Sequence, residues 1–176
     1  MPQAERRGRV AILSKTCAHW IMTDLAIWMA GYVSVPIYPT LTAASVRQIL
    51  EHSEARACFL GKLDDWPSMK SGIPEAVHCI RYPIAPEEPW PQWHDILAKT
   101  APVKGNPVRA ADELATIIYT SGTTGMPKGV MHSFANIAWA ASSCSRARSA
   151  GRPAGGVRCA SARACLPSRA TPRASS

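Results

Sequence analysis

Short apolar runs of strand length alternate along the chain with longer segments in which apolar residues recur at helical spacing. In residues 42–53, for example, Val46, Ile49 and Leu50 share one helical face behind Thr40 or Thr42, hydroxyl residues that can cap the helix. The pattern predicts strands at 9–14, 34–38, 57–60, 77–82 and 112–119, and helices at 17–30, 42–53, 93–99 and 130–141.

One strand-like run, residues 34–38, is interrupted by Pro36. Proline cannot donate a backbone hydrogen bond to a neighbouring strand, so this run is expected at the edge of a sheet or at a bend. Strands that alternate with helices favour an α/β fold, built on a mostly parallel sheet with flanking helices. In such sheets, ligands bind at the carboxyl ends of the strands.

The most apolar segment, residues 17–35, is long enough to be compared with a membrane span, which needs about 20 apolar residues. It contains His19 and Asp24, and an ionisable residue inside a span is costly in lipid. We therefore expect a helix buried against the sheet, with Gly31 closing its C-terminus.

The formal net charge of +8 is unevenly distributed. Residues 146–176 hold seven of the twenty basic residues and no acidic residue. Residues 1–145 therefore carry thirteen basic and twelve acidic residues, a net charge of +1. Because the basicity lies in the C-terminal segment and not in the part with a fold pattern, we expect no nucleic-acid partner.

The C-terminal segment, residues 142–176, also differs in composition from the rest of the chain. It contains eight Ser, eight Ala and seven Arg, but no Asp, Glu, Lys or aromatic residue. Without a periodic apolar face it cannot bury enough surface to offset the entropy of ordering it. A GC-rich gene read out of frame yields this composition, since GC-rich codons specify Arg, Ala, Gly, Pro and Ser. We expect a folded region at 1–141 and a disordered, out-of-frame tail at 142–176.

The six cysteines form no CxxC pair and no metal-ligand spacing, so no metal ligands are assigned. Three of them lie in apolar or strand-like surroundings, where buried free thiols are expected. No secretory signal is visible in the sequence, and a reducing cytoplasm is the expected compartment.

Residues 119–130 carry the densest candidate chemistry. Three glycines, four hydroxyl residues and Lys128 fall between an apolar run at 115–119 and a helix-compatible run at 130–141. Glycine lets the backbone approach an anion, hydroxyl and N–H groups donate to phosphate oxygens, and lysine adds positive charge. A strand, a glycine-rich loop and a helix in this order would also present a helix N-terminus to phosphate.

The spacing excludes the P-loop of NTPases, because Pro127 stands where that pattern needs Gly, and Lys128 is followed by Gly129. An ordinary strand–turn–helix connection with polar turn residues is the alternative interpretation. The density of glycines around a lysine favours phosphate binding.

The same stretch, Tyr-Thr-Ser-Gly-Thr-Thr-Gly-Met-Pro-Lys-Gly-Val, closely resembles the signature loop of the AMP-forming adenylating superfamily, which includes acyl-CoA synthetases, luciferases and adenylation domains of peptide synthetases. Upstream segments similar to the family's early strands and turns lie at 9–14, 28–36 and 38–42. The sequences of these segments are most similar to those of long-chain fatty acyl-CoA synthetases, and the resemblance covers residues 9–141. One departure is Phe134, which stands where many members have a histidine; no role is transferred to His132.

The resemblance implies part of an N-terminal domain of the acyl-CoA synthetase type, and two half-reactions. A fatty acid carboxylate attacks the α-phosphate of ATP, and the acyl-adenylate then passes its acyl group to coenzyme A. ATP, with Mg²⁺ on its phosphates, and coenzyme A are the implied cofactor and co-substrate. The residues implied to bind the β- and γ-phosphates are Thr120, Ser121, Gly122, Thr123, Thr124, Gly125 and Lys128.

Family members are several times longer than this chain, so the resemblance implies a fragment without the downstream adenine, ribose and magnesium motifs or the catalytic lysine. No residue of the chain can be nominated as a general base or nucleophile, and Asp112 and Glu113 are interpreted as surface charges. We expect an inactive remnant. The alternatives are a non-catalytic nucleotide-binding module and a fragment specific for another carboxylic acid. Peripheral membrane contact in full-length members is left open.

Overall fold

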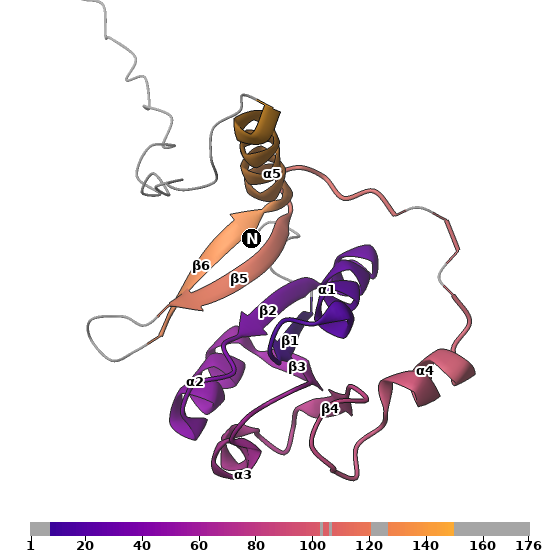
Figure 1. Ribbon diagram of the computed structural model, residues 1–176, viewed down its shortest axis with the longest axis vertical. Helices are drawn as coiled ribbons and strands as arrows, with labels where there is room; N and C mark the ends of the chain where they lie inside the picture. The colour runs from indigo at the N-terminus through magenta and orange to yellow at the C-terminus, as the bar shows by residue number, and fades with distance from the viewer. Residues whose placement is uncertain (1–7, 103, 106, 121–126, 150–176) are drawn as a thin grey trace, which may run out of the picture. The chain divides into compact units, whose positions relative to one another are not determined.

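The computed structural model describes residues 8–102, 104–105, 107–120 and 127–149. A six-stranded sheet has the order β4-β3-β1-β2-β5-β6 (Figure 1). The strands are β1 Arg9–Leu13, β2 Val33–Ile37, β3 Ala55–Leu60, β4 His78–Arg81, β5 Leu114–Thr120 and β6 Lys128–Ser133. The helices are α1 Ala18–Met29, α2 Ala43–Ser53, α3 Trp66–Met69 with a 3-10 turn at Lys70–Gly72, α4 Trp93–Lys99 and α5 Phe134–Ser149. The chain divides into two compact units, Met1–Trp139 and Ala140–Ser176, and the sheet lies in the first.

The sheet is mostly parallel, which confirms the predicted α/β fold. All neighbouring pairs from β4 to β5 are parallel, and among the described strands β6 alone runs antiparallel to its neighbour. The chain moves from β1 to β2 in one direction across the sheet, and from β2 back past β1 to β3 in the other. Right-handed crossovers therefore place α1 and α2 on opposite faces.

The main apolar core lies between α2 and the sheet. The predicted helical face of Val46, Ile49 and Leu50 is fully buried. Of the two candidate caps, Thr42 is the one used, because its side chain accepts a hydrogen bond from the Ser45 N–H at 3.3 Å. Alternate strand residues complete this core, among them Ala11, Leu13, Val33, Val35, Ile37, Ile117 and Tyr119.

Helix α1 is less buried than the sequence predicted. Only Thr23 and Ile27 are buried, and the Tyr82 hydroxyl donates to Thr23 Oγ1 at 2.7 Å. The apolar side chains left about half exposed are Ile21, Met22, Leu25 and Met29. Gly31 follows the helix with a φ of 87°, as expected of a residue that closes it. Within the described ranges, none of the helices has both the length and the apolarity needed to cross a membrane.

Pro36 lies on an inner strand, so its predicted edge position is wrong. Strand β2 runs between β1 and β5, and Pro36 is opposite Ile12 of β1. The pairing of β2 with β5 consists of one pair, Ser34–Thr116. Pro36 therefore lies past the end of that ladder, where the missing N–H interrupts no pairing with β5.

The helix predicted at 130–141 is also wrong over its first residues. Lys128–Ser133 is a strand that pairs antiparallel with β5, and α5 begins only at Phe134. The Ser133 hydroxyl accepts a hydrogen bond from the Asn136 N–H at 3.4 Å, a capping interaction that marks the true start of the helix. Pairing with β5 outweighs the weak local preference of this segment for helix.

Helix α5 continues to Ser149, past the boundary expected at residue 142. Residues 150–176 lie outside the described residues, so the predicted out-of-frame tail stays a prediction. Among the described cysteines, Cys58 and Cys79 are buried and free. They lie directly opposite each other on β3 and β4. Burial raises the pKa of Cys79 to about 11, as expected of an unreactive core thiol.

Candidate phosphate-binding site

The two described ends of the predicted phosphate-binding stretch lie opposite each other. Thr120 ends β5, Lys128 begins β6, and the two residues are register partners across the hairpin. The other predicted site residues, Ser121, Gly122, Thr123, Thr124 and Gly125, lie outside the described residues.

The structure removes one group that was expected to attract phosphate, a helix N-terminus directly after the glycine-rich stretch. Because a strand and not a helix follows the glycine-rich stretch, no helix N-terminus is placed directly after it. This corrects the expected strand–loop–helix arrangement. The groups left to bind phosphate are those of the strand-connecting stretch itself, namely its backbone N–H groups, its hydroxyls and Lys128.

Gly129 serves the packing of the hairpin. It is opposite Tyr119, and a Cβ on Gly129 would lie 2.9 Å from Ile117 Cγ2 and 3.2 Å from Tyr119 Cζ. The glycine therefore lets β6 pass close over two core side chains of β5. The sequence pattern grouped Gly129 with the phosphate-loop glycines, whereas its surroundings are apolar.

Tyr119 fixes one face of the hairpin to α2. Its ring is buried in the core, and its hydroxyl forms a 2.7 Å hydrogen bond with Nδ1 of His52 in the last turn of α2. The two rings meet edge to face with centroids 5.7 Å apart. Burial raises the pKa of the Tyr119 phenol, and the positive charge of Arg9 partly offsets the rise. Sequence reasoning missed His52, because nothing in the local pattern links α2 to β5.

A second anchor holds the start of the hairpin near the end of α1. Trp28 Nε1 donates to the carbonyl of Ala115 at 2.8 Å, and Arg109 Nη1 donates to the carbonyl of Trp28 at 2.8 Å. Arg109 also pairs with Glu113 and lies over the ring of Phe134, 5.3 Å from its centroid. Phe134 in turn meets Trp28 edge to face. The residue that departs from the family's histidine therefore packs in an aromatic and cationic cluster.

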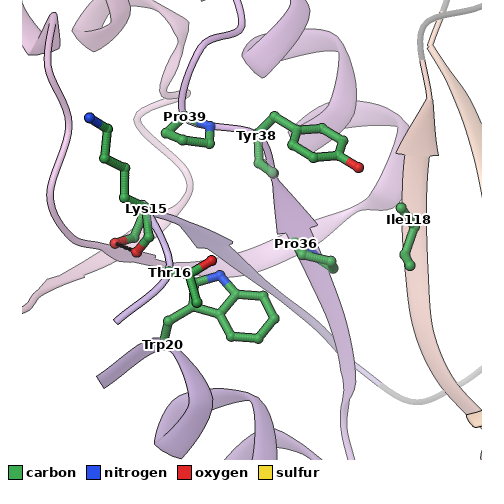
Figure 2. A pocket seen from close by; sticks show the side chains of 9 residues that line it. Lys15, Thr16, Trp20, Pro36, Tyr38, Pro39 and Ile118 are labelled. Carbon is green, nitrogen blue, oxygen red and sulfur yellow. Dashed lines mark hydrogen bonds between the residues drawn. The ribbon is translucent and has the colours of Figure 1, made fainter. Parts of the chain in front are cut away.

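A pocket opens at the carboxyl ends of the strands, as expected for a parallel sheet. Its volume is about 440 Å³, and Figure 2 shows Trp20 and Tyr38 on its walls, with Pro36 on β2 and Ile118 on β5. The pocket lies where β2 and β5 are no longer paired. The residues that line it are Ser14, Lys15, Thr16, Trp20, Pro36, Ile37, Tyr38, Pro39 and Ile118.

The chemistry of this pocket is mainly apolar. Its one cationic lining residue, Lys15, is paired with Asp64, 2.6 Å from Nζ to Oδ1. Within the described residues, no group of three or more His, Cys, Asp or Glu side chains is arranged to hold a metal ion.

The model of one protein family, the AMP-binding enzymes, matches residues 3–164. Among curated proteins, the chain is 35% identical over 137 residues to long-chain-fatty-acid–CoA ligase FadD15 of Mycobacterium bovis, covering 73% of this chain and 22% of the relative. It is 30% identical to human long-chain-fatty-acid–CoA ligase ACSBG2 over 149 residues, again covering 22% of the relative. The chain thus spans about a fifth of the length of these relatives.

Solved structures show the same fold. An anthranilate CoA ligase, AuaEII, in complex with anthranoyl-AMP superimposes with a TM-score of 0.62 at 23% identity, over 73% of this chain and 25% of that chain. A benzoate CoA ligase of Burkholderia xenovorans LB400 gives 0.61 at 22% identity, over 77% and 26%. The fold, the signature stretch and the family match agree, and the chain belongs to the AMP-binding enzyme family.

Proposed function

We propose that this chain carries the phosphate-binding hairpin of an enzyme that activates long-chain fatty acids. In the first half-reaction, a carboxylate oxygen of the acid attacks the α-phosphorus of ATP, and the bond to the bridging oxygen breaks to release pyrophosphate. In the second, the thiol of coenzyme A displaces AMP from the acyl-adenylate. ATP, a fatty acid and coenzyme A are the proposed partners.

The observation that carries this proposal is the pairing of Thr120 with Lys128 at the open end of the β5–β6 hairpin. This pairing brings a hydroxyl donor and an ammonium group to the two ends of a short glycine-rich connection. Negative charge builds up on the leaving pyrophosphate, and donors fixed in advance stabilise it without reorganisation. The proposed contacts to the β- and γ-phosphates come from Thr120, Ser121, Gly122, Thr123, Thr124, Gly125 and Lys128.

For the 176-residue chain itself we propose nucleotide binding without turnover. Catalysis needs the carboxylate, the adenine and the metal held in line as well as the leaving phosphates. The contacts proposed here are to the phosphates alone, and the chain spans about a fifth of the named fatty-acid ligases. The mainly apolar pocket beside β5 supports no assignment of a particular acid.

Calorimetry with ATP and Mg²⁺ tests the nucleotide binding, and a pyrophosphate-release assay with ATP, Mg²⁺ and fatty acids of several lengths tests the absence of turnover. We expect ATP binding and no acid-dependent release of pyrophosphate by this chain. Release that depends on the acid and is lost in Lys128→Ala would mean that the chain is a working adenylating enzyme. Absence of any ATP or pyrophosphate binding would refute the phosphate-binding assignment.

A further inference from the structure

The hairpin that ends in Thr120 and Lys128 has little backbone attachment to the rest of the sheet. β5 pairs with β6 from Leu114 to Thr120, whereas one pair, Ser34–Thr116, joins β5 to β2. The last residues of β5 therefore continue past their only bridge to the parallel part of the sheet. Where these residues lie depends on side-chain contacts.

Tyr119 supplies the contact nearest to the site. It directly precedes Thr120 and lies opposite Gly129, the residue after Lys128. Its side chain is 4% exposed and belongs to the core beneath α2. Because Gly129 packs against the same ring, the position of Tyr119 sets the position of both strands of the hairpin at this level.

The polar end of Tyr119 needs a partner, and His52 provides it. A phenolic hydroxyl at the end of a buried ring costs free energy unless it is hydrogen-bonded. The 2.7 Å bond to His52 Nδ1 satisfies it, and the edge-to-face contact of the rings fixes its direction. His52 itself is exposed, and both its Nδ1 and its ring contact Tyr119.

We propose that His52 is a positioning residue for the phosphate-binding hairpin. Through Tyr119 it holds the end of β5, and with it Thr120 and Lys128, against the last turn of α2. This inference rests on the proposed function for its effect on nucleotide binding, but the positioning of the hairpin can be measured without any ligand.

The test compares variants of the full 176-residue chain. His52→Ala and Tyr119→Phe each remove the bond, and Tyr119→Phe keeps the buried ring. The double variant measures their coupling. His52→Asn places an amide nitrogen near the position of Nδ1 and is the conservative variant. His78→Ala, which removes another exposed imidazole on the distant edge strand β4, is the control.

Two measurements are made on each variant. Hydrogen exchange reports the opening of residues 114–120 and 128–133, and calorimetry reports the affinity for ATP with Mg²⁺. We expect both single variants and the double variant to accelerate exchange in these strands by a similar factor, about 3- to 10-fold, with exchange in β1 and β3 unchanged. Affinity for ATP should fall by a similar factor, and His52→Asn should restore part of both.

Exchange in the hairpin no faster than in His78→Ala would overturn the proposal, and so would effects of the two single variants that add in the double variant. Equal acceleration in β1, β3 and the hairpin would also overturn it, because it would show a general loss of stability. If the wild-type chain binds no ATP, the proposed function is wrong, and the exchange data alone still decide whether His52 positions the hairpin.

Discussion

At the residue scale, neighbouring positions of the β5–β6 hairpin differ in whether they serve packing or face solvent. Gly129 belongs to the glycine-rich stretch, but its missing Cβ is required by Ile117 and Tyr119 on the opposite strand. Tyr119 combines a buried ring with a hydroxyl that reaches His52. Lys128, by contrast, is exposed at the first position of β6, where its ammonium group is available to an anion. Packing and the proposed phosphate binding are thus divided between neighbouring residues.

The charge of Lys128 should dominate its role. Lys128→Ala is expected to weaken binding of ATP or pyrophosphate by about 1–3 kcal/mol, the usual range for a hydrogen bond to a charged group. The loss should shrink as salt is added, since screening weakens an exposed charge. Calorimetry at two ionic strengths measures both effects, with Lys99→Ala on α4 as the matched control. Equal affinities of wild type and Lys128→Ala would remove this lysine from the site.

Asp24 is a partly buried acid whose effect on stability should depend on pH. Its Oδ1 is buried without a hydrogen-bond partner among the described residues. Burial raises its pKa, and the neighbouring Ser34 side chain offsets part of the rise. For an acid whose pKa is higher in the folded state, stability is fully present below the unfolded pKa, about 3.9, and is lost as pH rises through the folded pKa.

Asp24→Asn should therefore raise the free energy of unfolding at neutral pH, and the gain over wild type should disappear in acid, where Asp24 is neutral in both states. Urea denaturation between pH 3 and pH 8 measures the difference. Asp112→Asn, which changes an exposed acid, provides the comparison. A destabilised Asp24→Asn at pH 8 would contradict the assignment of a costly buried charge.

At the element scale, features set within a single element followed the local sequence, whereas features set by a neighbouring strand did not. Helix α2 has its cap, its apolar face and its end where the pattern put them, because each depends on residues within a few positions. Strand β6 was predicted as helix, and β2 was predicted at an edge or a bend, of which the edge position is wrong. Both errors concern which strand lies alongside. For β2, the neighbour that the sequence pattern did not reveal is β5, which is far away in the sequence.

The cap of α2 gives a prediction at this scale. Thr42→Ala should lower the free energy of unfolding by about 1 kcal/mol, because the Ser45 N–H loses its acceptor. Thr40→Ala, two residues earlier and exposed, should leave stability within about 0.5 kcal/mol of wild type. Urea unfolding of the two variants separates them. Equal losses would mean that the chain enters the helix differently from the structure described here.

At the scale of the whole molecule, the charge and the apolar surface are unevenly shared. Most of the net charge of +8 lies in residues 146–176, while the sheet-bearing part is close to neutral. Four large apolar side chains of α1 are about half exposed. The chain spans about a fifth of the length of the long-chain fatty acid–CoA ligases it resembles.

The tail leads to a prediction about the gene. We propose that residues 142–176 are read out of frame and that the part after α5 is disordered, because acids, lysine and aromatic residues all disappear after residue 141. Translating the same DNA in the other two forward frames should give a continuation that fits the AMP-binding family. If neither frame gives one, or if protection from hydrogen exchange extends through 150–176, this interpretation fails.

The sequence by itself determined the features that are local or periodic. The α/β class follows from alternating strand and helix patterns, the α2 cap from a hydroxyl before an apolar face, and the family from twelve consecutive residues at 119–130. In each case the physical cause lies within a short stretch of chain, so the sequence carries it directly.

Only the tertiary structure decided what depends on partners in other elements. Pairing with β5 made residues 128–133 a strand, the single bridge at Ser34 left room for Pro36 inside the sheet, and the fold brought His52 to Tyr119 across 67 positions. Strand pairing and side-chain contacts between separate elements are set by the shared packing of the whole sheet. No local spacing encodes them, which is why the family's signature stretch was recognisable in the sequence but its supporting hairpin was not.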